Sequence, residues 1–225
     1  MKVAVLSESP VDETAIRILV DGILGRVTEI PGMPALRARG VAHVFSVLGK
    51  VLRYLHYQTD AEALVIVVDS DRKPAHAPAH DQRESGDDEC RLCRIRKIIR
   101  QTKGDLRPVA DRPVIKTAVG LAVPSIEAWY RCCIDPQANE AAYSRTELGH
   151  IPRLIKHLKR DVYGSERYSL ELGTLRASEE ARRLVGSLGE FETLFPNGFG
   201  ALARDVRGWK ELEDEHDDQP SSEAT

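Results

Sequence analysis

Five consecutive apolar residues, Leu64 to Val68, end directly in two acids, Asp69 and Asp71, which one residue separates. An uninterrupted run rich in β-branched residues is typical of a parallel strand that is covered on both faces. Ligand sites in open α/β sheets lie just beyond the carboxyl ends of such strands. Two neighbouring carboxylates repel each other unless a cation lies between them, and Mg²⁺ prefers oxygen ligands. We therefore expect a metal site here; the alternative is a single Asp that caps the next turn.

Two other predicted strands also end in acids. Residues 3–6 form a short apolar strand that Glu8 follows, and Pro10 opens a predicted helix with Asp12 in its first turn. The helix dipole alone favours an acid at Asp12, whereas Glu8 lies in the loop. A third predicted strand, residues 114–123, leads into a helix with Glu127 in its first turn. Three strand ends thus deliver carboxylates to one edge of the sheet.

The order and spacing of these acids resemble the TOPRIM domain, which topoisomerases, bacterial primases and OLD-type nucleases share. The matching motifs are Glu8-Ser9-Pro10-Val11-Asp12, Asp69-Ser70-Asp71 and Glu127-Ala128-Trp129 followed by Asp135. The last motif is similar to one in small stand-alone bacterial TOPRIM-like proteins. The resemblance covers residues 1–136 and extends more loosely to Trp209. Ser9 stands where the family usually has glycine, which puts the loop geometry in question.

The resemblance implies a divalent-metal-dependent nuclease that hydrolyses phosphodiester bonds of DNA or RNA. Mg²⁺ or Mn²⁺ would be held by Glu8, Asp12, Asp69, Asp71 and Glu127. All of these except Asp12 would be catalytic, with Glu127 completing a second metal site or acting as a base. The resemblance further implies a role in anti-phage defence beside a separate SMC- or ABC-type ATPase.

Two other functions remain open at this point. A strand that ends in Asp-x-Asp also binds the metal of a nucleotide diphosphate in glycosyl- and nucleotidyl-transferases. Such transferases do not need the Glu8…Asp12 motif, which argues against this alternative. The other alternative is a non-catalytic TOPRIM-like module that binds a partner.

Basic residues are expected to offset the acids. We expect six of them to contact nucleic-acid phosphates. Arg72 directly follows the acid pair; Arg91, Arg94 and Lys97 lie on a predicted helix from residue 88; Lys156 and Lys159 lie on a second predicted helix near residue 151. A solvated helix face is the other interpretation. Few aromatic residues are interleaved with these bases, so backbone contact is favoured over base stacking.

The apolar strands and amphipathic helices predict an α/β protein with a mostly parallel sheet flanked by helices, and the resemblance implies that this sheet is TOPRIM- or Rossmann-like. We expect an α/β domain over residues 1–136, a helical extension packed on it over 137–210, and a disordered acidic tail over 211–225. The sequence of 225 residues has no long apolar run and no signal peptide, which predicts a cytoplasmic protein without membrane contact. It also lacks a Walker loop, so any ATPase would be a separate chain. Its oligomeric state stays open.

A second group of candidate ligands lies in the long loop after Asp71. His76-x3-His80 is followed by Cys90-x2-Cys93, and these four side chains could hold zinc tetrahedrally. The alternative is ordinary thiols on a helix. The loop, about residues 72–89, exceeds the usual length of a connection, which indicates a flexible substrate-facing loop or a small inserted element.

Overall fold

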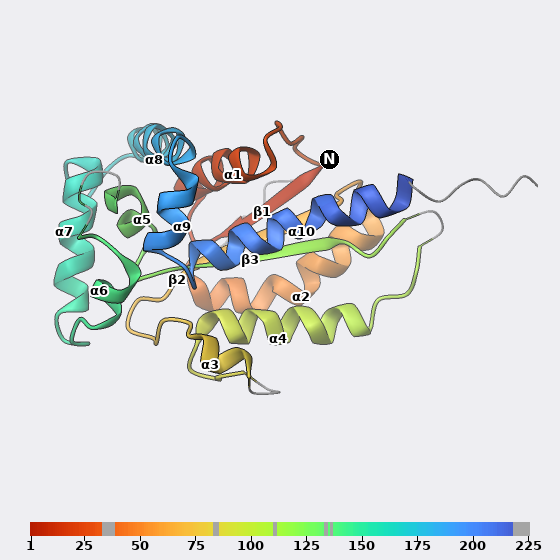
Figure 1. Ribbon diagram of the computed structural model, residues 1–225, viewed down its shortest axis with the longest axis horizontal. Helices are drawn as coiled ribbons and strands as arrows, with labels where there is room; N and C mark the ends of the chain where they lie inside the picture. Colours follow the sequence, from red (N-terminus) through yellow and green to blue (C-terminus); the bar gives the residue numbers. More distant parts are fainter. Residues whose placement is uncertain (33–38, 83–85, 110–111, 133–134, 136, 218–225) are drawn as a thin grey trace, which may run out of the picture.

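Three parallel strands form the centre of the computed structural model, in the order β1 (Val3–Ser7), β2 (Ala63–Asp69), β3 (Lys116–Ala122) (Figure 1). Helices cover both faces of this sheet. The predicted α/β class with a parallel sheet is therefore confirmed. The structure describes residues 1–32, 39–82, 86–109, 112–132, 135 and 137–217, with side chains described as far as Trp209.

The side chains of the strands alternate between two hydrophobic cores. In β2, Val65 and Val67 enter the core that contains α1 (Pro10–Leu24), whereas Leu64 and Ile66 enter the core that contains α2 (Val41–Gln58) and α4 (Arg91–Gly104). A strand with apolar side chains on both faces is buried from both sides. This explains the unbroken apolar run in the sequence.

The helices after β3 complete one of these cores. They are α5 (Ile126–Cys132), α6 (Glu140–Ser144), α7 (Ile151–Tyr163), α8 (Leu170–Val185), α9 (Leu188–Leu194) and α10 (Phe199–Asp217). Helix α8 packs against α1, and α10 runs along β3 (Figure 1). Trp129 lies at the centre of this face, with its ring 5.7 Å from that of Phe191 and 5.6 Å from that of Phe199. The C-terminal helices thus share a core with the sheet.

The order of the strands reverses beside β1. The backbone of Val3 donates to the carbonyl of Glu29 at 3.0 Å, so the segment after α1 adds a single bridge on the outer side of β1. The chain then returns through α2 to β2 on the other side. In parallel α/β sheets, ligands bind in the crevice at such a reversal, outside the carboxyl ends of the strands. In this chain the crevice lies between the ends of β1 and β2.

The C-terminal stretch differs in part from the expected disordered tail. Helix α10 continues to Asp217, so the backbone is helical over the first part of residues 211–225. Leu and Glu are good helix formers, which is consistent with this extension. Residues 218–225 lie outside the described residues. Among the helices of the described residues, none is both long and apolar enough to span a membrane.

Candidate active site at the carboxyl ends of the strands

Glu8 is anchored to the end of the neighbouring strand. Its Oε1 accepts a hydrogen bond of 2.9 Å from the backbone N–H of Asp69. The preceding strand β1 ends at Ser7, and α1 begins at Pro10, so Glu8 lies in the short connection between them. Ser9 has an extended backbone (φ −141°), which requires no glycine, and its hydroxyl accepts from Val11 N–H at 3.2 Å as the cap of α1.

Asp69 links the end of β2 to the start of α5. Its Oδ1 accepts a hydrogen bond of 2.9 Å from the backbone N–H of Ile126. The next residue, Glu127, is only 4% exposed although it carries a carboxylate. Its Oε2 is buried and has no hydrogen-bond partner among the described residues. Buried carboxylate oxygens normally have a partner, and Glu140 Oε1 also lacks one among the described residues. What distinguishes Glu127 is that its charge raises the pKa of Asp69 and Asp12.

The pKa values show that the acids of the three strand ends lie close together. Burial raises the pKa of Asp69 well above its ordinary value, and the negative charges of Glu127, Glu8, Asp12 and Asp71 raise it further. Burial also raises the pKa of Asp12, in the first turn of α1, and the negative charge of Glu127 is the next largest cause of this increase. These carboxylates can all be ionised together only if a cation offsets their repulsion.

Two basic side chains partly supply that positive charge. Lys159 on α7 lowers the pKa of Asp12 against the larger effect of burial. For Glu8, burial raises the pKa, whereas the N–H of Asp69 and the charge of Arg91 oppose the shift. The pKa of Asp12 and that of Glu8 both remain raised, so Lys159 and Arg91 do not cancel the effect of burial on these two acids.

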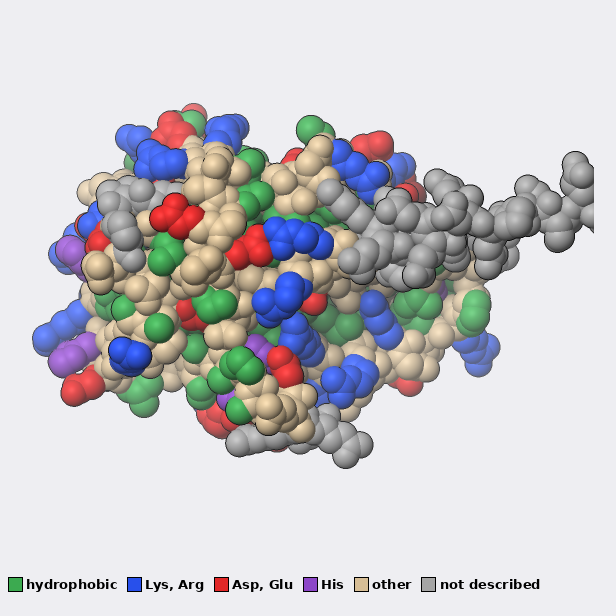
Figure 2. All heavy atoms as spheres, viewed as in Figure 1, with side chains coloured by type: hydrophobic (Ala, Val, Ile, Leu, Met, Phe, Trp, Pro, Cys, Tyr) green, Lys and Arg blue, Asp and Glu red, His purple; other side chains and the backbone are tan. Residues whose placement is uncertain are grey.

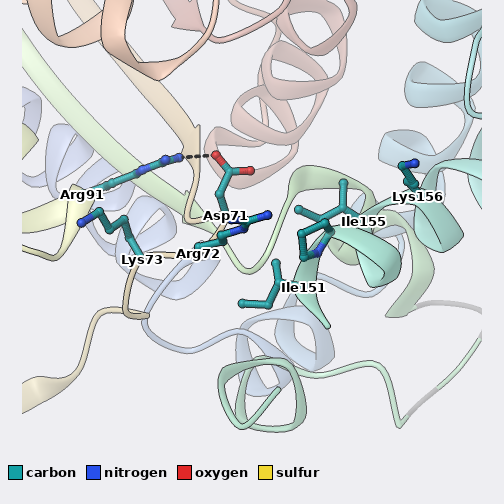
Figure 3. A pocket seen from close by; sticks show the side chains of 8 residues that line it. Asp71, Arg72, Lys73, Arg91, Ile151, Ile155 and Lys156 are labelled. Carbon is teal, nitrogen blue, oxygen red and sulfur yellow. Dashed lines mark hydrogen bonds and ion pairs between the residues drawn. The ribbon is translucent and has the colours of Figure 1, made fainter. Parts of the chain in front are cut away.

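Asp71 and Arg91 form the rim of the site. Arg91 Nη1 donates to Asp71 Oδ2 at 2.8 Å (Figure 3). It also donates to the carbonyl oxygen of Asp69 at 2.6 Å and lies 3.8 Å from Glu8 Oε1. Asp71 has φ 48°, in the left-handed region that non-glycine residues seldom occupy. Its side chain is 42% exposed. Asp71 therefore faces solvent beside the buried acids, where a substrate could reach it.

A cleft of about 600 Å³ opens beside this rim (Figure 3). It lies between the loop after β2, the start of α4 and the first turns of α7. The residues that line it are Asp71, Arg72, Lys73, Arg91, Ile151, Pro152, Ile155 and Lys156. A second hollow of about 380 Å³ shares Asp71, Arg72, Lys73 and Ile151 with the first. Cationic side chains thus surround the exposed carboxylate of Asp71.

The structure brings together only some of the predicted phosphate-contact residues. Arg72, Arg91 and Lys156 line the cleft, and Lys159 lies near Asp12. Arg94 instead lies over the ring of Phe45, at 4.3 Å from its centroid. Lys97 pairs with Asp88 at 3.2 Å. Helix α4 contributes mainly its first residue to the site, because its axis runs away from the strand ends (Figure 1).

Other basic side chains of α4 and α10 are paired with acids. Figure 2 shows blue basic side chains gathered over these helices with red acidic ones among them. On α4, Arg96 contacts Asp81 at 3.2 Å, and on α10, Arg207 pairs with Glu192. Pairs of this kind lower the positive charge that such a surface offers to phosphates.

Sequence reasoning missed four residues of the site. Lys73 lines the cleft and pairs with Glu89, and its position just after Asp-x-Asp could have indicated it. Tyr130, Tyr163 and Tyr168 lie near the acids, which is seen from the raised pKa values of all three; burial is the main cause in each case, and the charges of Asp12 and Glu127 add to it. They come from α5, α7 and the loop before α8, and no local pattern marks them.

The residues fit a divalent metal ion by their chemistry. The donors are carboxylates, which suit Mg²⁺ and Mn²⁺, and the unpartnered Oε2 of Glu127 offers a ligand atom. Backbone N–H groups hold Glu8 and Asp69 in place, so two of the carboxylates are oriented in advance. Within the described residues, the group of ligand atoms already close enough together to hold a metal ion is a separate His and Cys group, so the carboxylates would have to draw closer around a bound ion.

Comparisons with known proteins give no family assignment. No family model matches this sequence, and no curated protein or solved structure is significantly similar to it. The chemistry of the site itself therefore has to support any function assigned to the chain.

Proposed function

We propose that this chain is a divalent-metal-dependent nuclease of the TOPRIM-like, OLD-type kind, which hydrolyses phosphodiester bonds of DNA or RNA. One observation carries the proposal: carboxylates from three strand ends gather at one sheet edge, where they repel one another. Burial raises the pKa of Asp12 and Asp69, the charges of the neighbouring acids raise both further, and Glu127 Oε2 is buried without a hydrogen-bond partner among the described residues. A cleft lined by cations adjoins these acids, which suits a polyanionic substrate.

The acids would hold Mg²⁺ or Mn²⁺. Glu8, Asp69 and Glu127 would provide the inner ligands, with Asp12 and Asp71 on either side. When bound, the metal supplies activation of the attacking water and neutralisation of the leaving oxygen. The backbone hydrogen bonds to Glu8 and Asp69 fix these side chains before substrate arrives, which lowers the cost of orienting them.

The basic residues would position the substrate. A guanidinium has five N–H groups, so Arg91 can contact a phosphate while its Nη1 stays on Asp71 and the carbonyl of Asp69. Arg72, Lys73 and Lys156 would bind neighbouring phosphates along the cleft. These charges also offset the repulsion between the acids and the nucleic-acid backbone.

The test is a cleavage assay with plasmid, linear DNA and tRNA in Mg²⁺, in Mn²⁺ and in EDTA. We expect cleavage that requires the metal and that Glu8→Gln, Asp69→Asn and Glu127→Gln each abolish. Glu140→Gln is the matched control, because Glu140 is a buried acid that accepts from Asn197 N–H at 2.9 Å, away from the cluster. Activity that persists in the three site variants would refute the proposal.

The same assay separates the alternative functions. The cleft of about 600 Å³ lies within the size range of small-ligand sites, which is the feature that favours a nucleotide-diphosphate transferase. A nucleotide-sugar arm with Mg²⁺ tests for that reaction. Metal binding without any product would favour a non-catalytic module. A role in anti-phage defence beside a separate SMC- or ABC-type ATPase rests on the family resemblance alone.

A further inference from the structure

We propose that His76, His80, Cys90 and Cys93 form a structural zinc site that is separate from the carboxylate cluster. The two histidines lie in the long connection after β2, on either side of the start of α3 (Pro78–Asp81), and the two cysteines lie at the start of α4 (Figure 1). Their ligand atoms all lie within 4.8 Å of one another. The segment that the sequence marked as an unusually long loop is thus a small inserted element with its own ligand set.

The separations between the ligand atoms fit a tetrahedral ion. His76 Nδ1 lies 3.4 Å from Cys93 Sγ and 3.7 Å from Cys90 Sγ, and His80 Nδ1 lies 3.8 Å from Cys93 Sγ. Zn–N bonds of about 2.0 Å and Zn–S bonds of about 2.3 Å at tetrahedral angles place N and S ligands roughly 3.5 Å apart. One zinc ion can therefore bind all four side chains with small adjustments.

A carboxylate lies beside the outer nitrogen of each histidine. His76 Nε2 lies 3.2 Å from Asp81 Oδ2, and His80 Nε2 lies 3.6 Å from Asp87 Oδ2. An acid on the far ring nitrogen is typical of zinc-bound histidine, because it fixes the tautomer and the ring orientation. Here both rings turn Nδ1 toward the thiols and Nε2 toward an acid. Ordinary thiols on a helix would not need this arrangement.

The site lacks an open position for a substrate. Cys90, Cys93 and His76 are buried, and four protein side chains complete a tetrahedral shell. Closed shells of this kind stabilise folds, whereas catalytic zinc keeps one position for water. The oxygen-rich cluster suits Mg²⁺ and the nitrogen and sulfur cluster suits zinc, so the two sites select different metals.

Zinc would also hold the active-site rim in position. Arg91 lies between the two cysteine ligands in the sequence, and its guanidinium contacts Asp71 and the carbonyl of Asp69. The histidine ligands close the loop that carries Arg72 and Lys73. Zinc thus ties the start of α4 and this loop together, which makes it a positioning element for the cleft.

The test is zinc analysis of the full chain purified without chelator, by elemental mass spectrometry. We expect about one zinc ion per chain in the wild-type protein. Each of the four single variants Cys90→Ser, Cys93→Ser, His76→Asn and His80→Asn should lower the zinc content to less than about a tenth of an ion per chain. Asp81→Asn should weaken zinc affinity roughly 10- to 100-fold, because it removes the acid on His76. Cys132→Ser, a buried cysteine on α5 outside the cluster, is the matched control and should keep its zinc.

Cobalt substitution provides a readout that does not depend on folding yield. The metal-free full chain should take up Co²⁺ and show thiolate-to-cobalt charge-transfer bands with intense tetrahedral d–d bands, and Cys90→Ser should weaken the former. None of these measurements depends on nuclease activity, so failure of the zinc site and failure of the proposed function are distinguishable. Absence of zinc together with no uptake of Zn²⁺ or Co²⁺ would overturn the proposal.

Discussion

The carboxylate of Glu8 accepts a hydrogen bond of 2.9 Å from the backbone N–H of Asp69, across 61 positions of the sequence. This contact joins the connection after β1 to the end of β2 at the point where the strand order reverses. Asp69 in turn accepts from Ile126 N–H, which brings Glu127 beside it. Two backbone hydrogen bonds thus fix the acids of three strand ends relative to one another.

The buried acids should destabilise the metal-free protein. Glu127→Gln replaces a buried carboxyl group that raises the pKa of Asp12 and Asp69, so we expect the free energy of unfolding in EDTA to rise by roughly 0.5–2 kcal/mol. Urea titration in EDTA and in Mg²⁺ measures this. The wild-type protein should gain more from Mg²⁺ than the variant does. Equal stabilisation by Mg²⁺ in the two proteins would contradict metal binding at Glu127.

The stability should fall as pH rises above about 4 in the absence of metal. Burial and neighbouring acids raise the pKa of Asp12 and Asp69 well above the ordinary 3.8, so the folded chain binds more protons than the unfolded one in that window. The free energy of unfolding therefore decreases from pH 3.8 upward through the raised pKa values. Calorimetric Tm values across this range, in EDTA, measure the slope.

Asp69→Asn should make that decrease shallower, because one titrating group is gone. Mg²⁺ should have the same effect on the wild-type protein, since it stabilises the ionised carboxylates. Glu140→Gln controls for other buried acids, because burial also raises the pKa of Glu140, and it should leave the Mg²⁺ effect intact. Identical pH profiles for wild type and Asp69→Asn would count against the electrostatic coupling.

Arg91 should matter far more than its neighbour Arg94 on the same helix. Arg91→Ala removes the contacts to Asp71 and the carbonyl of Asp69, and we expect roughly a 100-fold loss of cleavage rate. Arg94→Ala removes a cation from the ring of Phe45, outside the cleft, and should change the rate less than about threefold. Single-turnover rates at saturating metal compare the two. Equal losses would place the substrate along α4 instead.

Lys156 should contribute to nucleic-acid affinity without affecting sequence preference. It lines the cleft, where its pair with Glu166 at 3.7 Å is exposed and therefore weak. Lys156→Ala should lower the slope of log affinity against log salt by about 1, because one phosphate contact is lost. Fluorescence anisotropy in EDTA measures binding without cleavage. Lys97→Ala, whose side chain pairs with Asp88 away from the cleft, should keep the wild-type slope.

The packing of α10 on β3 can be tested with two glycines. A side chain at Gly198 would overlap the carbonyl oxygen of Leu121, so Gly198→Ala should cost about 3 kcal/mol or more of unfolding free energy. Gly189 in α9 has open space around it, so Gly189→Ala should stabilise the protein by up to about 1 kcal/mol. Chemical denaturation of both variants gives the comparison. A neutral effect at Gly198 would mean that this junction lies farther from β3.

Much of the fold could be predicted from local patterns. The apolar run from Leu64 to Val68 predicted a buried parallel strand, and the structure places its alternate side chains in two separate cores. The acids after β1 and β2 and at the start of α5 were predicted to meet at one sheet edge. Glu8 accepts from the N–H of Asp69, and Asp69 accepts from the N–H of Ile126, while their role as a shared metal site stays a prediction. The position of an acid at the end of a strand can be read from neighbouring residues in the sequence. Because parallel strands run in the same direction, their carboxyl ends lie at the same edge of the sheet.

The cations of the cleft could not be predicted in the same way. The polarity of their segments predicted that all six basic candidates are exposed, but it could not predict which of them reach the cleft. Lys156 lines the cleft because α7 packs beside the strand ends. Arg94 and Lys97, on the favoured basic helix, turn to Phe45 and Asp88 instead. Helical periodicity shows which residues share a face, yet not which neighbouring element that face meets.

The sequence by itself determined the element types, the parallel sheet and the acids at the strand ends, because hydrophobic periodicity and chain direction are written into neighbouring residues. Only the tertiary structure decided that Glu127 Oε2 is buried without a hydrogen-bond partner among the described residues and that Tyr130, Tyr163 and Tyr168 lie near the acids. The spacing of the two histidines and two cysteines suggested a ligand set, and the structure places their ligand atoms together. These arrangements depend on how elements far apart in the chain pack together. Contacts between such elements follow from the filling of a shared core, which no local spacing encodes.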